Sequence, residues 1–415
     1  MKYKQAVILC GGRGERLKPL TNKIPKPMVS IEGKPFLYYL LRQLSNKQIK
    51  NFILLTGYKG NKIKSYFKDG KKFGWNINYS NGLTEWNTGK RIYEAKKFLK
   101  NDFILLYSDN YINLNIDNLF NKHQSHNYPI TMTLVKKNNG NISLNKKLNI
   151  NSYSPKKTKD NLNYVELGYM IINKKQIFER FFKKEPKVNF NFSKVLETSA
   201  KKKQLGNVLV ENVYYSISDP ERFKITSNFL KKKKILLIDR DGIINEKANK
   251  AKYIESWKDF RFINKNIEGL KLLSKQGFKF IIITNQACIA QNIITRNKLN
   301  YIHRKMKSEL LKDGIEILKV YFSPDHYNNN KSKTRKPAPG MFFSASKDFK
   351  LNLDDCLYVG DDIRDCIASY NAGFKSVFIG KKNSIKTLNK KQYPVFVSKD
   401  ITNSVKFILD YYNEK

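Results

Sequence analysis

The chain has 415 residues, of which 40% are hydrophobic and 13% aromatic, and its formal net charge is +44. This length predicts two or three domains, each able to bury a core, and the apolar content excludes an intrinsically disordered protein. The positive charge would suit nucleic-acid binding, but the lysines are spread over the whole chain among many Asn, Ile, Tyr and Phe residues, all of which have A/T-rich codons. We therefore attribute the charge mainly to codon bias and expect no nucleic-acid partner.

No segment of the sequence predicts a membrane-bound or exported protein. Apolar runs stay short of the ~20 residues that a membrane helix needs, and the N-terminus leads into a strand without a signal-peptide pattern. The four cysteines show neither a CxxC spacing nor a disulfide framework. We expect a cytoplasmic protein that does not bind a membrane.

A glycine-rich turn follows the first predicted strand, residues 6–9. Its glycines leave backbone N–H groups accessible to an anion, and three basic side chains add positive charge. These residues are Gly11, Gly12 and Gly14, with Arg13, Arg16 and Lys26. Ligands of open α/β sheets bind at the carboxyl ends of strands, so the turn is a candidate phosphate site, although a glycine turn alone is more often only a tight turn.

The complete pattern, GGRGERLKPLT followed by PKPM, resembles the signature of the sugar-1-phosphate nucleotidyltransferases. Those enzymes join a nucleoside triphosphate to a sugar 1-phosphate and release pyrophosphate. The resemblance implies that the glycines and Arg16 hold the triphosphate and that Lys26 contacts phosphates. Because nucleotidyl transfer depends mainly on positioning and charge neutralisation, Arg16 and Lys26 are assigned to catalysis. The glycines and Arg13 are assigned to nucleotide binding.

The rest of the first half alternates predicted helices and strands. A helix is predicted over residues 35–44, and strands over 52–56, 103–110 and 164–173. Asp109, near the end of one strand, is either a helix cap or, by its resemblance to the family's Gly-Asp site, a ligand that holds Mg²⁺ against the triphosphate. The same resemblance assigns Thr88 and Gly89 to the nucleotide and Glu166 to the sugar hydroxyls. The family's Glu-Lys-Pro element is degraded here, so Lys156 or Lys157 either meets the sugar phosphate or is a solvated surface lysine.

One departure from the family concerns the second metal ligand. Many of its members end the domain with Trp-x-Asp-Ile-Gly-Thr-Pro, whose Asp binds metal, whereas this chain has YYSISDPERF. That Asp becomes Ser216, and Asp219 lies three positions later. Either the metal site depends on Asp109 and the substrate phosphates, or the domain binds nucleotide as a regulatory or scaffolding module without turning it over. We expect transferase activity, because the phosphate-binding signature is intact.

The run KKKK at residues 231–234 predicts a linker, and we place the boundary there, giving domains 1–230 and 231–415. The strand over 235–238 then leads to Asp239 and Asp241. Residues i and i+2 of an extended strand point the same way, so both carboxylates are expected to face one ligand. A calcium-type loop or a simple turn are the alternatives.

Three later features favour a phosphatase over those alternatives. The strand over 280–286 contains Thr284, Lys336 lies in RKPAPGM, and the strand over 357–362 ends in acids. In this order the features resemble the four motifs of the haloacid-dehalogenase-type phosphatases. The resemblance makes Asp239 the nucleophile that forms an aspartyl-phosphate and Asp241 the general acid and base. Thr284 and Lys336 would hold the phosphoryl oxygens.

The same resemblance implies a second Mg²⁺ site. It is formed by Asp239, Asp241 and Asp361 with a backbone carbonyl, and it keeps two anions from repelling each other. Asp362 and Asp365 either assist the metal or cap the following helix.

A finer resemblance is to the heptose 1,7-bisphosphate 7-phosphatases and the related histidinol-phosphate phosphatases. It is carried by DRDGIIN, AKYIESWKDFRFI, TNQACIAQ, RKPAPGM and GDDIRDCIASYNAG. It assigns Asn285 to substrate binding and Arg335 to the distal phosphate. The family's Gly-Ile-Ala-Arg-Gly is altered here to CIAQN, which removes an arginine and two glycines.

Zinc is a further point of difference from these phosphatases. Relatives often carry a zinc loop of Cys and His before Arg-Lys-Pro, whereas the corresponding positions here are Ser323, Asp325, Ser332 and Thr334. His326 alone cannot complete a tetrahedral site, so we expect no structural zinc. A strand over 393–397 and a helix over 401–412 are predicted to close the second sheet.

The predicted fold is α/β with two doubly wound, Rossmann-like domains, the first of nucleotidyltransferase type and the second of haloacid-dehalogenase type. The resemblances imply removal of the 7-phosphate from D-glycero-D-manno-heptose 1,7-bisphosphate, followed by nucleotidyl transfer to the 1-phosphate, with GTP favoured and Mg²⁺ in both domains. The alternatives are another phosphorylated sugar, another nucleotide, or histidinol phosphate at the second site. The sequence leaves the nucleobase, the sugar and its anomer, and homo-oligomer formation open.

Overall fold

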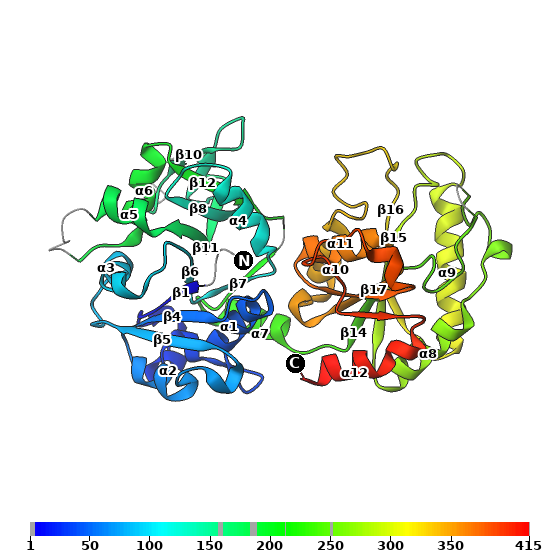
Figure 1. Ribbon diagram of the computed structural model, residues 1–415, viewed down its shortest axis with the longest axis horizontal. Helices are drawn as coiled ribbons and strands as arrows, with labels where there is room; N and C mark the ends of the chain where they lie inside the picture. Colours follow the sequence, from blue (N-terminus) through cyan, green and yellow to red (C-terminus); the bar gives the residue numbers. More distant parts are fainter. Residues whose placement is uncertain (1–4, 157–160, 183–188, 212, 250–251, 415) are drawn as a thin grey trace. The chain divides into compact units, whose positions relative to one another are not determined.

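The computed structural model describes residues 5–156, 161–182, 189–211, 213–249 and 252–414. The chain divides into two compact units, Met1–Lys231 and Lys232–Lys415. Figure 1 colours the N-terminal unit from blue to green and the C-terminal unit from green to red. No helix among the described residues is long and apolar enough to cross a bilayer.

The N-terminal unit is built on a mixed sheet with the order β10-β9-β11-β6-β1-β4-β5, to which β8 adds beside β11 and β12 beside β8. Its strands are β1 (Gln5–Cys10), β2 (Ser30–Ile31), β3 (Lys34–Pro35), β4 (Asn51–Thr56), β5 (Asn76–Asn81), β6 (Asp102–Tyr107), β7 (Asn110–Ile112), β8 (Ile130–Lys136), β9 (Ile142–Leu144), β10 (Ile150–Tyr153), β11 (Tyr164–Asn173), β12 (Leu205–Leu209) and β13 (Tyr214–Ser216). Its helices are α1 (Phe36–Asn46), α2 (Gly60–Phe67), α3 (Thr88–Glu94), α4 (Ile116–Gln124), α5 (Lys174–Phe181), α6 (Phe192–Lys201) and α7 (Pro220–Leu230).

The apolar run of β1 is buried on both faces, because successive side chains of a strand point to opposite sides of the sheet. Ala6 and Ile8 join one hydrophobic core, and Val7 and Leu9 join another. β1 is parallel to β4 on one side and to β6 on the other. The order in which strands are added to the sheet therefore reverses at β1, which makes β1 a topological switch point. The carboxyl end of a strand at such a point is where open α/β sheets bind ligands.

The C-terminal unit has a parallel sheet with the order β16-β15-β14-β17-β18-β19. Its strands are β14 (Ile235–Ile238), β15 (Lys279–Asn285), β16 (Ile317–Ser323), β17 (Leu357–Gly360), β18 (Lys375–Ile379) and β19 (Phe396–Ser398). Its helices are α8 (Asn264–Lys275), α9 (Arg296–Lys312), α10 (Gly340–Phe349), α11 (Ile363–Ala372) and α12 (Val405–Glu414). β14 lies between β15 and β17, so its carboxyl end is the equivalent switch point.

The predicted α/β class with two doubly wound units is confirmed. Most predicted elements match to within one or two residues, but two strands end earlier: β6 at Tyr107 and β17 at Gly360. Asp109 and Asp361 therefore lie in the loops beyond them. The last predicted strand was placed too early, because Pro394 has no N–H to donate, and β19 begins only at Phe396. The last helix begins at Val405, after a 3₁₀ turn over Thr402–Ser404.

Candidate active sites

In the N-terminal unit a pocket of about 360 Å³ opens at the carboxyl end of β1, within the ~300–1,000 Å³ of small-molecule sites. Five of the predicted residues line it: Gly11, Gly12, Lys26, Thr88 and Asp109. The structure thus brings together residues from the glycine turn, from the 3₁₀ turn at Lys26, from the start of α3 and from the loop after β6.

An ion pair crosses the pocket. Lys26 Nζ lies 2.7 Å from Asp109 Oδ2. The Ser108 hydroxyl donates to the Leu9 carbonyl oxygen at 2.6 Å, which fixes the end of β6 against that of β1. Asp109 is therefore a partly exposed carboxylate with a cation already beside it, in a position to meet a bound phosphate together with that cation.

The other predicted residues of this unit lie around the pocket rather than in its lining. Arg13 and Arg16 are exposed, and Arg13 Nη2 is 3.8 Å from Glu85 Oε1. Gly14 has φ 65°, and a Cβ there would lie 2.7 Å from Lys26 Cβ, so this glycine is required for packing under Lys26. A Cβ on Gly89 would lie 2.2 Å from the ring of Phe190, so this glycine allows α3 to approach the 190–192 segment.

Thr88, in the pocket lining, and Glu166 have different surroundings. The Thr88 hydroxyl accepts a hydrogen bond from the Phe192 N–H at 2.8 Å. Burial raises the pKa of Glu166 to about 7, and the nearby negative charge of Asp109 adds to the rise, against hydrogen bonds from Asn141 and Tyr153. Lys156 is exposed, and Lys157 lies outside the described residues.

Arg91, on α3, is the residue of this pocket that sequence reasoning missed. Its buried guanidinium donates to the carbonyl oxygens of Thr56 at 2.6 Å and Leu83 at 2.7 Å, and to those of Gly11 and Thr84 at 3.3 Å. A Cβ on Gly11 would lie 2.2 Å from Arg91 Cζ. Gly11 is therefore needed as much for this guanidinium as for a phosphate.

The place of the family's second metal ligand holds no carboxylate. Ser216 pairs with Asn110 across β13 and β7, one residue from Asp109, and its hydroxyl donates to Ser218 Oγ at 3.1 Å. Asp219 caps α7 by accepting from the Arg222 N–H at 2.9 Å. Of the two positions that the family uses for metal, only Asp109 thus offers Mg²⁺ a carboxylate, which fits an ion held mainly by substrate phosphates.

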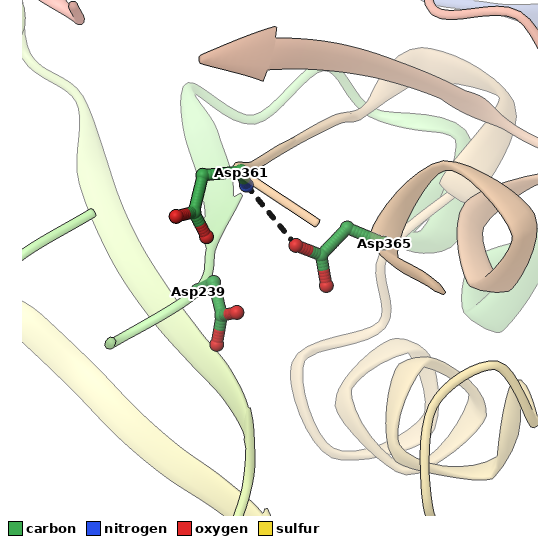
Figure 2. A group of neighbouring side chains, drawn as sticks. All are labelled: Asp239, Asp361 and Asp365. Carbon is green, nitrogen blue, oxygen red and sulfur yellow. Dashed lines mark hydrogen bonds between the residues drawn. The ribbon is translucent and has the colours of Figure 1, made fainter. Parts of the chain in front are cut away.

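In the C-terminal unit, Asp239 lies at the carboxyl end of β14 and forms a cluster with Asp361 and Asp365, shown in Figure 2. Carboxylate oxygens of the three lie within 4.8 Å of one another, and they are the one such group of three found among the described residues. Asp361 Oδ1 is buried without a hydrogen-bond partner, which is the state expected of a metal ligand. These residues fit Mg²⁺, an ion that prefers oxygen ligands.

Lysines neutralise this cluster. The buried Lys336 places Nζ 2.9 Å from Asp239 Oδ2 and 2.7 Å from Asp365 Oδ1. Burial lowers the pKa of Lys336, but the two carboxylates outweigh it, so its pKa is raised and the side chain stays charged. Lys247, which sequence reasoning missed, lies with Nζ 2.6 Å from Asp361 Oδ2. In a chain with 79 Lys and Arg residues, no local pattern distinguishes it.

Asp241 lies apart from the cluster of three carboxylates. Its side chain accepts hydrogen bonds from Arg240 at 2.8 and 2.9 Å, from Asn245 at 2.9 Å and from Gln286 at 2.8 Å. Burial raises the pKa of Asp241, but these donors outweigh it and hold the pKa below its ordinary value. Gln286 also donates to Thr284 Oγ1 at 2.9 Å, which links the predicted acid–base residue to the predicted phosphate-binding hydroxyl.

His303, which contacts Arg240 behind Asp241, was not predicted from the sequence. The Arg240 guanidinium, 1% exposed, faces His303 with 3.0 Å between Nη1 and Nε2. Since arginine only donates, Nε2 accepts and the imidazole is neutral. Burial and the charge of Arg240 lower the pKa of His303 to about 3. His303 thus orients the arginine that fixes Asp241.

The two remaining predicted residues, Asn285 and Arg335, lie next to Lys336. The Asn285 side chain forms two hydrogen bonds with the backbone of Lys336, donating to its carbonyl oxygen at 3.1 Å and accepting from its N–H at 2.9 Å. Arg335 is half-buried, and its Nη1 donates to the Asp325 carbonyl oxygen at 3.3 Å. Asp362 caps α11 in a capping box with Asp365, so Asp365 serves both the helix and the cluster.

Comparison with known proteins agrees with the two predicted domain types. The family model described as nucleotidyl transferase matches residues 5–259, more than half of the chain, and the one described as polynucleotide kinase 3 phosphatase matches residues 234–403. The chain belongs to the nucleotidyl transferase family. This nucleotidyl transferase therefore carries a phosphatase-type unit after its first domain, as the sequence motifs indicated.

Curated relatives give each half of this nucleotidyl transferase a narrower family. It is 31% identical over 223 residues to the D-glycero-alpha-D-manno-heptose 1-phosphate guanylyltransferase of Campylobacter jejuni, covering 53% of this chain and 96% of that protein. It is 34% identical over 155 residues to the D-glycero-alpha-D-manno-heptose-1,7-bisphosphate 7-phosphatase of Photorhabdus laumondii, covering 36% of this chain and 82% of that protein. The chain therefore also belongs to these two families.

A third relative matches over less of its length. The chain is 35% identical over 154 residues to a Bacillus subtilis protein named probable glucose-1-phosphate cytidylyltransferase, covering 32% of this chain and 61% of that protein.

Proposed function

We propose that the chain catalyses two consecutive reactions that produce a nucleotide-activated heptose. The C-terminal unit removes the 7-phosphate of D-glycero-D-manno-heptose 1,7-bisphosphate, and the N-terminal unit transfers GMP from GTP to the resulting 1-phosphate with release of pyrophosphate. The observation that carries the proposal is that two families whose named activities share this sugar 1-phosphate occur on one chain. In each unit the residues predicted to bind phosphate lie near the carboxyl end of the strand at which the strand order reverses.

In the phosphatase unit, Asp239 attacks the phosphorus, so that a carboxylate–phosphorus bond forms while the bond to the sugar oxygen breaks. Lys336, already beside Asp239, and Thr284 hold the phosphoryl oxygens. Asp241 gives its proton to the leaving sugar oxygen and then takes one from the water that hydrolyses the aspartyl-phosphate. The donors around Asp241 favour the second role, so it must gain a proton when substrate binds before it acts as an acid.

Asp239 and Asp361 would hold Mg²⁺, which supplies positive charge that lets an anionic carboxylate approach an anionic phosphate. Asp365 lies in the same cluster and stays bound to the backbone N–H groups of Asp361 and Asp362, at 3.1 and 3.0 Å, which keeps that loop in place. Lys247 is the cation that accompanies Asp361 at the mouth of the site.

In the transferase unit, the triphosphate lies against the glycine turn at the end of β1, with Lys26 and Arg16 neutralising its oxygens. An oxygen of the sugar 1-phosphate attacks the α-phosphorus, and pyrophosphate leaves. Asp109 would hold Mg²⁺ on the triphosphate, and Glu166 would accept hydrogen bonds from sugar hydroxyls. Thr88 and Gly89 would shape the side of the pocket nearest the nucleotide.

One observation favours a second candidate for the N-terminal unit. Ser216 stands where the family has a metal-binding acid, and Asp219 is occupied as a helix cap. A unit with one metal-binding carboxylate would serve as a nucleotide-binding module that regulates the phosphatase.

The proposal also covers the compartment, the partners and the use of the product. The four cysteines are all buried thiols, which suits a reducing compartment, so we place the enzyme in the cytoplasm. Its partners are GTP and phosphorylated heptose, and the product serves surface polysaccharide synthesis.

A paired assay on the purified chain tests the proposal. Phosphate release from the heptose bisphosphate is followed first, and then formation of nucleotide-sugar and pyrophosphate with each of the common triphosphates. Phosphate release without any nucleotide-sugar would favour the regulatory module, and the absence of both would refute the proposed function.

A further inference from the structure

The loop between β16 and Lys336 is closed by a cluster of hydroxyl and carboxylate groups that plays no part in the mechanism above. Asp325 Oδ2 accepts hydrogen bonds from the Ser332 hydroxyl and, at 3.1 Å, from the Thr334 hydroxyl. The hydroxyls of Thr334 and Ser323 are 2.9 Å apart. We call Ser323, Asp325, Ser332 and Thr334 the hydroxyl clasp.

The clasp occupies the four positions at which the sequence resemblance would place zinc ligands, and its geometry does not fit zinc. Structural zinc needs thiolates or imidazoles around an open tetrahedral centre, and these four side chains are neither. Their oxygen atoms bond directly to one another, so they leave no centre for an ion. The backbone contact of the neighbouring imidazole, His326 Nδ1, is with the Asn328 N–H at 3.2 Å.

The clasp also contacts Arg335, which the sequence resemblance assigns to the distal phosphate, and it is linked to Lys336 of the proposed mechanism. Ser332 Oγ accepts from the Arg335 N–H at 2.9 Å, and the carbonyl oxygen of Asp325 accepts from Arg335 Nη1 at 3.3 Å. On its other side, the Ser323 carbonyl oxygen accepts from the Gln286 N–H at 2.7 Å, next to the Asn285 side chain that holds the Lys336 backbone. The clasp thus ties β16 to the backbone just before Lys336.

We propose that the hydroxyl clasp is a metal-free positioning device that replaces a zinc loop and holds Arg335 and Lys336 in place for a substrate phosphate. This proposal rests on the proposed phosphatase function. A carboxylate that accepts from two hydroxyl donors stabilises a partly buried loop through charge-assisted hydrogen bonds, and these bonds need no metal ion. The donors also lower the pKa of Asp325, so the carboxylate remains ionised at neutral pH.

The first test removes the clasp carboxylate and compares it with a matched carboxylate elsewhere in the unit. Asp325→Ala leaves the hydroxyls without their acceptor, whereas Asp325→Asn keeps one oxygen that accepts. The control is Asp348→Ala, since Asp348 is exposed and accepts from Lys319 at 2.6 Å and Tyr321 at 2.7 Å without touching the loop. Kinetics are measured on the full chain with heptose bisphosphate and with p-nitrophenyl phosphate.

We expect Asp325→Ala to lower kcat/KM by about tenfold to a hundredfold on both substrates, because small displacements of a positioning group cost this much. We expect Asp325→Asn to recover part of the loss and Asp348→Ala to leave activity unchanged. Equal activity of Asp325→Ala and Asp348→Ala would overturn the proposal. If Asp325→Ala fails to fold, Ser332→Ala replaces it, since it removes only the hydroxyl that the Arg335 N–H requires.

The second test concerns the metal. Protein purified without chelator is analysed for zinc by mass spectrometry, then stripped with EDTA and supplied with Mg²⁺ alone. We expect no bound zinc and full recovery of phosphatase activity. Stoichiometric bound zinc, or recovery of phosphatase activity only when zinc is added, would overturn the proposal. Hydrolysis of p-nitrophenyl phosphate but not of heptose bisphosphate would instead refute the proposed substrate and leave the clasp testable.

Discussion

Replacing Arg91 by methionine removes a buried cation that holds the carboxyl ends of β1 and β4 together. Its two shortest hydrogen bonds, to the carbonyl oxygens of Thr56 and Leu83, are 2.6 and 2.7 Å long. Bonds to a charged group contribute about 1.5–3 kcal/mol each, so the two together contribute roughly 3–6 kcal/mol. Methionine avoids the cost of burying a charge, which offsets part of this. We expect the N-terminal unit to lose about 2–4 kcal/mol.

Hydrogen exchange of the full chain measures this loss, because the two units can be followed separately by their peptides. Protection should fall in the peptide that contains β4 and stay unchanged in the peptide that contains β14. Arg91→Lys is the matched control, since it keeps the charge but cannot reach the same set of carbonyl oxygens, and it should lie between the wild type and Arg91→Met. GTP binding by calorimetry should weaken in the same order. Wild-type protection of β4 in Arg91→Met would refute this account of the turn.

Two pH effects follow from the buried acids. Burial raises the pKa of Glu166 from 4.5 to about 7 in the folded protein, so folding takes up a proton between these values and stability falls as pH rises through that window. Glu166→Gln cannot titrate, so the Tm of this variant minus the Tm of the wild type should increase as pH rises from about 5 to about 8. A Tm difference that does not change with pH would contradict this. In the C-terminal unit, burial raises the pKa of Asp239 to about 7 and of Asp361 to about 6. Mg²⁺ must displace those protons, so calorimetry should show binding that weakens as pH falls, whereas a flat profile would count against this site.

The strands and the residues at their ends could be predicted because each depends on local pattern. Apolar runs bounded by polar turns identified β1, β11 and β14. Parallel strands have their carboxyl ends at one edge, so the residues after β14 and β17 had to meet there. This arrangement agrees with the resemblance to the haloacid-dehalogenase-type phosphatases, from which Asp239 and Asp361 were expected at one site.

Contacts between distant segments could not be predicted in this way. Arg91 binds carbonyl oxygens 35 and 80 residues away in sequence, and on α3 it looked like any other basic residue. The contacts of Asp241 could not be predicted from strand alternation, because β14 ends at Ile238. Beyond that point the backbone turns, and the Asp241 carboxylate meets Arg240.

The central claim is that two independent phosphate-handling centres lie on one chain, and two substitutions assayed for both activities test it most directly. Asp239→Asn should abolish phosphate release from heptose bisphosphate while nucleotide-sugar formation from the 1-phosphate continues at the wild-type rate. Asp109→Asn should abolish nucleotide-sugar formation and leave phosphate release intact. Loss of both activities in either variant, with the fold retained, would contradict the division into two separate centres.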